Sequence, residues 1–382
     1  MYSAFKDAFL YEITSIRNSV YKILLISLLP LLSFFLIIVI FHSGVARDLP
    51  IAAVDNDRSN LSRMVLHNID ASPTIDIRYK VNSPKEAIDL VKSSKAYAAI
   101  IIPRHFEKDT LLQKSPRITA MLNTQYILVG KILHSALSTT VMHSSAQVEY
   151  VKKLADLRNS DAALHAVSPI DIQVTPFFNT YQNYYYFLVS ALLPTIWQIF
   201  IVIATIVAVG SLFKAGKEKD FFHESSIIPA KLLGMMLPYT IIYMLIGILY
   251  TLYLYSEWSF QGSFFTLFFG MFLTLVAYQF VALFLFATSF DYARSMSMGA
   301  VYSAPAFAFL GITFPAYNMN GFALFWRDIL PVTHYTQLQL SQANYGLSFW
   351  QESDKLITLL LFWLVFIPVI LLFRKKLKKV RS

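Results

Sequence analysis

The densest group of chemically active side chains lies between Lys217 and Glu224, where lysines, carboxylates, a histidine and two phenylalanines follow one another. A phosphate-cradling loop requires G-x-x-x-x-G-K-[ST], but the stretch from Gly210 to Glu218 has one residue too many and places Glu after its lysine. His223 and Glu224 lack the second histidine that would put two imidazoles on one helical face. The sequence therefore predicts no catalytic residue, no metal site and no cofactor bound by this chain.

The same segment fits a docking surface for another protein. An excess of positive charge on the inner side of a membrane explains its lysines, whereas carboxylates interleaved with aromatic rings suit a partner surface. A solvated loop is the alternative interpretation. The candidate contact residues are Glu218, Lys219, Asp220, Phe221, His223 and Glu224.

Long apolar segments must position this surface. Hydrophobic residues make up 56% of the 382 residues and charged residues only 14%, which is too apolar for an ordinary soluble domain. A spanning helix needs about 20 apolar residues. The expected fold is a polytopic α-helical membrane protein with six transmembrane helices, at about 23–42, 183–211, 232–254, 264–290, 295–315 and 356–373.

The distribution of Lys and Arg predicts the orientation. Fourteen of them lie in four segments on one side (the N-terminal stretch to Lys22, the 214–231 loop, the turn at Arg294 and the tail), against two in the short loops opposite. Basic loops stay in the cytoplasm, so we expect both termini there, in a bacterial inner membrane. The net charge of +9 is then a topology signal, and no nucleic acid is expected as a partner.

Both ends of the chain have an expected role at the membrane. Residues 1–22 carry apolar side chains at helical spacing, which predicts an interfacial helix on the cytoplasmic side. Residues 374–382 form a basic cytoplasmic tail that suits anionic headgroups.

A periplasmic α/β domain is expected over 43–182, between the first and second transmembrane helices. Apolar stretches bounded by turn residues predict strands near 49–54, 75–79, 97–102 and 118–122, with helices between them. After Asn123 the pattern turns helical and continues through Leu164.

Four stretches carry a resemblance to a known family: Leu49 to Ser59, Ala98 to Phe106, Gly311 to Pro315, and Leu330 to Tyr335. In this order, around one plus five helices, the chain resembles the permease subunits of type-2 ATP-binding-cassette exporters, in the branch with a large ectodomain after the first helix. The Gly-Thr and Gly-Lys pairs that the family carries after its second helix are absent here.

The resemblance implies a half-transporter that exports lipophilic or amphipathic compounds, such as drugs or lipid-like molecules. It implies a cytoplasmic ATPase partner that binds ATP and Mg, and a second permease copy or close paralogue. A periplasmic adaptor and an outer-membrane channel are further expected partners. A non-transporting receptor or secretion accessory that presents the periplasmic domain is the alternative function.

Residues 316–354 are neither a normal soluble loop nor a full span, and they predict an external re-entrant hairpin that gates the path. A pair of interfacial helices that merely anchors the loop is the alternative. The candidate gate residues are Phe314, Pro315, Phe325, Trp326, Pro331, His334 and Tyr335.

Overall fold

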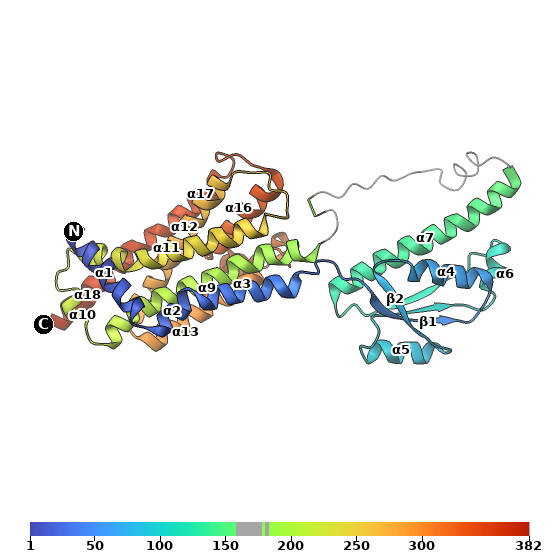
Figure 1. Cartoon of the computed structure of the whole chain (residues 1–382), viewed down its shortest axis with the longest axis horizontal. Coiled ribbons are helices and arrows are strands. Elements are labelled where there is room, and N and C mark those ends of the chain that lie inside the picture. Colours follow the sequence, from blue (N-terminus) through green and yellow to red (C-terminus); the bar gives the residue numbers. More distant parts are fainter. Residues whose placement is uncertain (158–177, 180–182, 382) are drawn as a thin grey trace. The chain divides into compact units, whose positions relative to one another are not determined.

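The computed structural model describes residues 1–157, 178–179 and 183–381, and the chain forms two compact units. One unit comprises Met1–Gly44 with Phe178–Ser382 and is helical, and the other comprises Val45–Phe177 and contains a β-sheet (Figure 1). Each unit has its own hydrophobic core. In sequence, the α/β unit follows the first long apolar helix segment and precedes the second.

The α/β unit is built on a four-stranded sheet with the order β2-β1-β3-β4. Strand β1 pairs in parallel with β2 and β3, while β4 runs antiparallel to β3. The four strands expected from the sequence are all present. Their bounds are β1 Leu49–Asp55, β2 Ile75–Lys80, β3 Ala98–Ile102 and β4 Thr119–Leu122.

Successive side chains of β1 point to opposite faces of the sheet, and helices cover both of these faces. Ile51 and Ala53 pack in one core with residues of α4 and α7, whereas Ala52 and Val54 pack in another with residues of α5. The helix α7 is 31 residues long, and the part of the expected helical stretch beyond Leu157 lies outside the described residues. The helices of this unit are α4 Asn60–Asp70, α5 Pro84–Lys92, α6 Phe106–Leu111 and α7 Ile127–Leu157.

Five segments of the described chain are long and apolar enough to cross a membrane, one fewer than the six expected. The first joins α2 and α3, and the last joins α17, η2 and α18, which also carries the basic tail. The five are Val20–Phe41 (α2 Val20–Ile26, α3 Leu28–Phe41), α9 Tyr184–Lys214, α11 Ile228–Leu254, α12 Phe264–Ser289 and Ser353–Lys378 (α17 Ser353–Leu361, η2 Phe362–Val365, α18 Phe366–Arg381).

The segment expected as one helix over 295–315 is the one that differs. Helix α13 ends after 12 residues, Pro305 stands before the short α14, and Gly311 then adopts φ +84°. Proline removes a backbone donor and a left-handed glycine ends a helix, so the helix is broken where composition alone shows an apolar run. The elements from here to the next span are α13 Tyr292–Ser303, α14 Ala306–Phe309, η1 Ala316–Asn318, α15 Gly321–Asp328 and α16 Pro331–Tyr345.

Helices α13 and α16 lie along the same partner, α9, one after the other. Gly210 near the end of α9 lies against α13. In the middle of α9, Gln198 donates to the carbonyl of Ser303, the last residue of α13, at 3.0 Å. Near the start of α9, the carbonyl of Ser190 accepts from Gln339 of α16 at 2.9 Å. Two half-length helices therefore cover the length that one unbroken helix was expected to cover.

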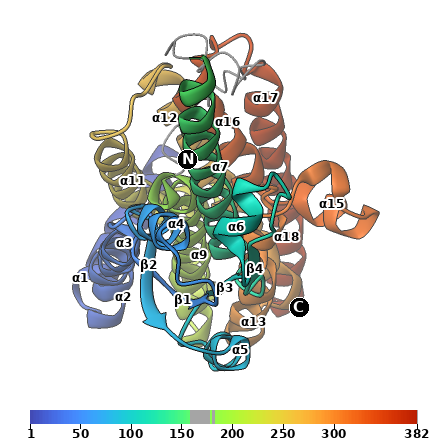
Figure 2. The ribbon, with the colours of Figure 1, turned by 90° about the vertical axis from the view of Figure 1, so that its right-hand side faces the viewer.

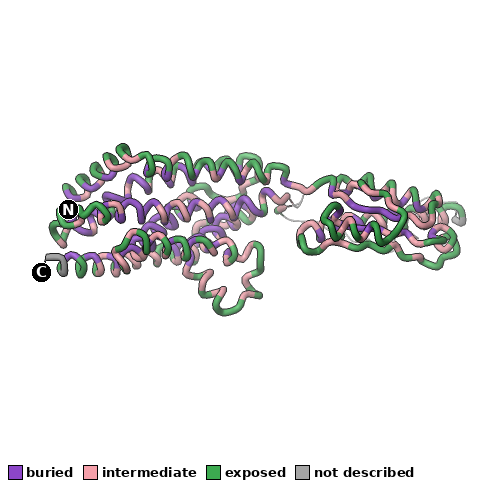
Figure 3. Tube along the Cα trace, turned by 90° about the horizontal axis from the view of Figure 1, so that it is seen from below, coloured by how far each residue is buried: buried purple, intermediate pink, exposed green. Residues whose placement is uncertain are grey.

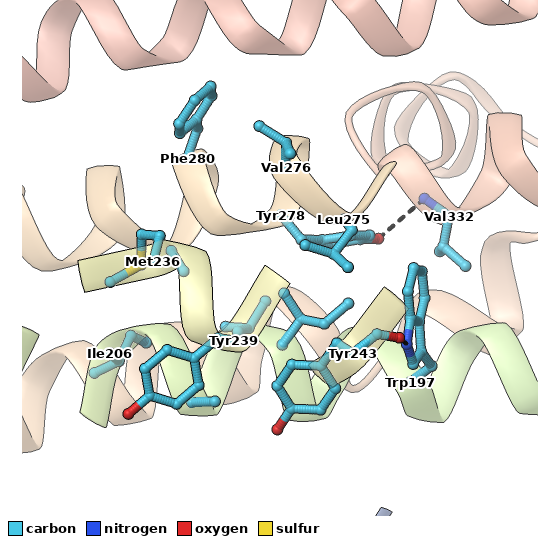
Figure 4. Packing of buried hydrophobic residues seen from close by; sticks show 14 of the residues in the cluster. Trp197, Ile206, Met236, Tyr239, Tyr243, Leu275, Val276, Tyr278, Phe280 and Val332 are labelled. Carbon is cyan, nitrogen blue, oxygen red and sulfur yellow. Dashed lines mark hydrogen bonds between the residues drawn. The ribbon is translucent and has the colours of Figure 1, made fainter. Parts of the chain in front are cut away.

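Buried residues run along the helices of the helical unit (Figure 3), and many of them are aromatic (Figure 4). Specific hydrogen bonds cross this core. Trp197 donates from Nε1 to the carbonyl of Tyr243 at 2.9 Å, which joins α9 to α11. The hydroxyl of Tyr278 accepts from the backbone N–H of Val332 at 3.1 Å, which joins α12 to the first turn of α16. Bonds of this kind fix the register of membrane helices, where apolar packing alone distinguishes neighbours poorly.

Candidate functional site

The segment expected to dock a partner follows α9 and contains the short helix α10, Glu218–Phe221. Its anchor is Phe222, which the sequence analysis did not select. This ring is fully buried and packs with Phe213 of α9 and Phe373 of α18, at centroid distances of 6.5 and 5.7 Å. A buried aromatic ring removes a large apolar area from water, so the segment is fixed to α9 and α18.

A second anchor is Phe221, which is half-buried. Its ring lies 5.0 Å from the ring of Tyr11 in α1, Tyr2–Arg17, and 4.7 Å below the ammonium of Lys231. The same ammonium donates to the carbonyl of Phe221. Cation–π contact and hydrogen bond together hold the segment against the first turn of α11.

The charged residues of the segment remain at the surface. Lys219, Asp220, His223 and Glu224 are exposed, and Glu218 is half-exposed. The carboxylate of Glu224 accepts from Ser226 at 2.5 Å. A buried and a half-buried phenylalanine thus support a charged face.

Helix α1 belongs to the same region because it packs along the start of α11. Ala8 is fully buried, and a Cβ placed on Gly234 would collide with the backbone carbonyl of Phe5. The contact also contains a buried ion pair between Glu12 of α1 and Lys22 of α2. No local signal in the sequence indicates this pair, since a glutamate and a lysine ten residues apart are ordinary features of an amphipathic segment.

The residues expected to form an external gate fall into two groups. Phe314, Pro315 and Phe325 are exposed. Pro331 and Tyr335 are buried, and the Tyr335 ring lies 6.3 Å from that of Trp197.

The two remaining gate candidates, Trp326 and His334, are half-buried. Trp326 lies 6.2 Å from Phe322 and 6.3 Å from Phe309, between rings of α15 and α14. His334 contacts the carbonyl of Asp328 through Nε2 at 3.1 Å. The expected pair of short helices is therefore present, with α15 projecting from the helical unit and α16 packed inside it (Figure 2).

Within the described ranges, no three His, Asp or Glu side chains lie close enough together to share a metal ion. The features that stand out are instead the charged surface around α10 and the two short helices α13 and α16 along α9.

Comparison with known proteins identifies a family that the sequence matches. The family model for ABC-2 family transporter proteins matches residues 21–372, which is most of the chain. No curated protein matches the sequence.

Proposed function

Because this chain belongs to the ABC-2 family of transporter proteins, we propose that it is the permease of an ABC exporter for lipophilic or amphipathic compounds. The family identifies a multi-pass membrane subunit that is not itself catalytic and works with an ABC ATPase. The ATPase supplies the energy by binding ATP and Mg. The amphipathic nature of the compound is the part that belongs to our proposal.

The observation that carries the proposal is the supported surface around α10. The movement of the ATPase must reach the transmembrane helices of a permease through a segment that is held rigidly against them. Phe222 ties this segment to α9 and α18, and Phe221 ties it to α1 and α11. Displacement of α10 would therefore move several spans together, while its exposed charges provide specific contacts.

We propose that the described crossings place both termini in the cytoplasm of a bacterial inner membrane. The charge distribution favours that side for α10 and for the tail. If α13 and α16 together make one crossing, the chain crosses six times, which agrees with termini on one side. The α/β unit is then periplasmic, where an adaptor and an outer-membrane channel are candidate partners.

The pairing with a second permease copy, or a close paralogue, is supported by the region between α13 and α16. This region begins and ends beside the middle of long helices, at Ser303 and at Val332. Its irregular backbone around Gly311 leads to α15, where Phe322 and Phe325 are 69% and 60% exposed. Non-helical backbone at membrane depth is tolerated only where protein or a water-filled cavity covers it, and a second copy provides that cover.

The proposal of an amphipathic substrate draws on the chemistry of the helical unit's core. Its core combines aromatic rings with hydroxyl and amide groups, as at Trp197, Tyr335 and Gln339. Such a set accommodates apolar bodies and satisfies a few polar groups. We place the gate at the first turns of α16, together with α15.

The test is purification of the chain with the ATPase encoded beside it, followed by reconstitution into liposomes and assay across a panel of lipids and lipophilic drugs. We expect co-purification and stimulation of ATP hydrolysis by at least one amphiphile. A chain that purifies without any ATPase and leaves hydrolysis unchanged would instead favour the receptor or secretion-accessory function.

A further inference from the structure

A groove of about 580 Å³ lies between α3 and α11. Its floor is the contact between Phe34 and Tyr250, whose rings meet edge to face at 5.3 Å and whose side chains are almost fully buried. The walls are apolar side chains that the protein leaves exposed. The lining residues are Leu31, Phe34, Phe35, Ile38, Val39, His42, Leu249, Tyr250 and Tyr253.

The first span packs mainly on α9 and touches α11 at only a few places. At α2, the carbonyl of Leu25 accepts from the hydroxyl of Tyr243 of α11 at 3.1 Å. The helix then breaks at Ser27, with φ −127° and ψ −76°. Along α3, Phe34 meets Tyr250 of α11, and at the far end Phe41 contacts Tyr184 of α9, at 5.9 Å between rings. Because the contact between α3 and α11 is narrow, a groove remains open beside it.

We propose that this groove binds one hydrocarbon chain of a bilayer phospholipid. Protein interiors are close-packed, and an unfilled gap loses dispersion contacts. An empty groove would therefore be unfavourable. Water does not fill an apolar space, since it needs several polar partners. A hydrocarbon chain of a bilayer lipid is apolar along its whole length and therefore matches the groove.

The length of the groove agrees with a chain from one leaflet. From Leu31 to His42 the helix rises about 16 Å at 1.5 Å per residue, which is about half of the 30 Å hydrocarbon core. The groove ends where α3 ends, at His42, and beside Tyr253 near the end of α11. These two polar side chains are placed where the headgroup of the lipid would begin.

The lining also predicts what the site selects. None of the nine lining residues is Lys or Arg, which are the side chains that recognise anionic headgroups in membrane proteins. The site should therefore recognise the chain and not the headgroup. Phosphatidylethanolamine and phosphatidylglycerol with equal chains should occupy it equally.

The experiment uses phospholipids with a photoreactive diazirine in one acyl chain, added to the full-length protein in liposomes. Val39→Trp and Leu249→Trp fill the groove from its two walls. Ile40→Trp is the matched control, because Ile40 is 68% exposed on the same helix and does not line the groove. We expect labelling of α3 and α11 in the wild type and in the control, and loss of most of it in both filled variants.

A second readout shows whether the variants are folded and whether they bind. In detergent, added phospholipid should raise the Tm of the wild type and of Ile40→Trp, because a ligand that binds only the folded state stabilises it. The filled variants should unfold cooperatively but lose this gain. Equal labelling of wild type and filled variants, or labelling that depends on the headgroup, would overturn the proposal. Neither readout requires the ATPase, so the result is independent of the proposed export function.

Discussion

Lys22 donates to the Glu12 carboxylate at 2.6 Å, and both side chains are buried, with exposed fractions of 4% and 0%. The hydroxyl of Tyr239 donates to the same oxygen at 2.7 Å. Three segments, α1, α2 and α11, thus meet at one carboxylate. Removing one partner of a buried pair leaves an uncompensated charge, which costs about 3 to 5 kcal/mol.

We expect Lys22→Met to destabilise the protein strongly, because it leaves the Glu12 carboxylate buried without its cation. We expect Glu12→Gln to destabilise it less, because the ammonium that it leaves without a carboxylate keeps hydrogen bonds to the amide oxygen and to Ser15. Thermal unfolding in detergent measures the difference. Loss of Tm in Glu12→Gln as large as in Lys22→Met would show that the negative charge itself stabilises this contact.

The same carboxyl gives a pH dependence. Burial raises the pKa of Glu12, against the opposing effects of Lys22 and the Tyr239 hydroxyl. A carboxyl whose folded pKa lies above its unfolded value adds stability below the unfolded pKa and loses it as the pH rises through the folded pKa. Unfolding followed from about pH 4 to about pH 8 should therefore show a contribution that falls with rising pH and is absent from Glu12→Gln. An unchanged profile in Glu12→Gln would contradict the raised pKa.

Gly234 should not tolerate a side chain. The added methyl of Gly234→Ala meets the backbone carbonyl of Phe5, so α1 must move away from α11, at a cost of about 1 to 3 kcal/mol. We expect a lower Tm and faster proteolysis within α1. Gly321→Ala is the control, because nothing lies within 4 Å of a Cβ there. Equal Tm values for the two variants would mean that α1 is not held at Gly234.

Topology can be tested without reference to the family. A reporter active only in the periplasm should work when fused near Ala155 in α7 and should fail near Lys217 or after Lys379. The expectation rests on the positive charge around α10 and in the tail. Reporter activity at Lys217 would reject the orientation.

Substitutions on the α10 surface should affect coupling to the ATPase without affecting the stability of the permease. Changing Glu218, Asp220 and Glu224 together to Ala should leave Tm nearly unchanged, since exposed substitutions usually cost within about 0.5 kcal/mol each. ATPase binding and export should be lost. Arg374→Ala with Lys375→Ala is a control for altered charge in the exposed tail. Export at the wild-type rate in the triple variant would show that this loop is only solvated.

Phe222→Ala should act differently from the triple variant. Removing a buried aromatic ring costs about 3 to 5 kcal/mol, so Tm should fall together with coupling. A normal Tm in this variant would mean that the aromatic contacts of Phe222 do not anchor the segment.

The exposed helix α15 supplies the test of pairing and gating. The chain contains no cysteine, so Phe325→Cys should form a disulfide between two copies, whereas Ile40→Cys on α3 should not. If α15 takes part in gating, oxidation should stop export and substrate-stimulated ATP hydrolysis, and reduction should restore both. Crosslinked protein that exports normally would make α15 a fixed contact and place the gate elsewhere.

The sequence by itself determined the features that depend on local composition and period. Apolar length located five of the six expected spans, apolar stretches bounded by turn residues located all four strands, and the charges around Lys217 marked the segment that contains α10. These signals are local, because helix length, strand pleat and turn chemistry are set by neighbouring residues.

Only the tertiary structure decided how distant segments meet. It ended the expected fifth span at Ser303 and laid α16 along the part of α9 that the unbroken helix was expected to cover. It also joined Glu12 to Tyr239, 227 residues apart, and formed the groove between α3 and α11. Contacts between residues so far apart depend on how whole helices pack, and composition and period carry no record of that packing.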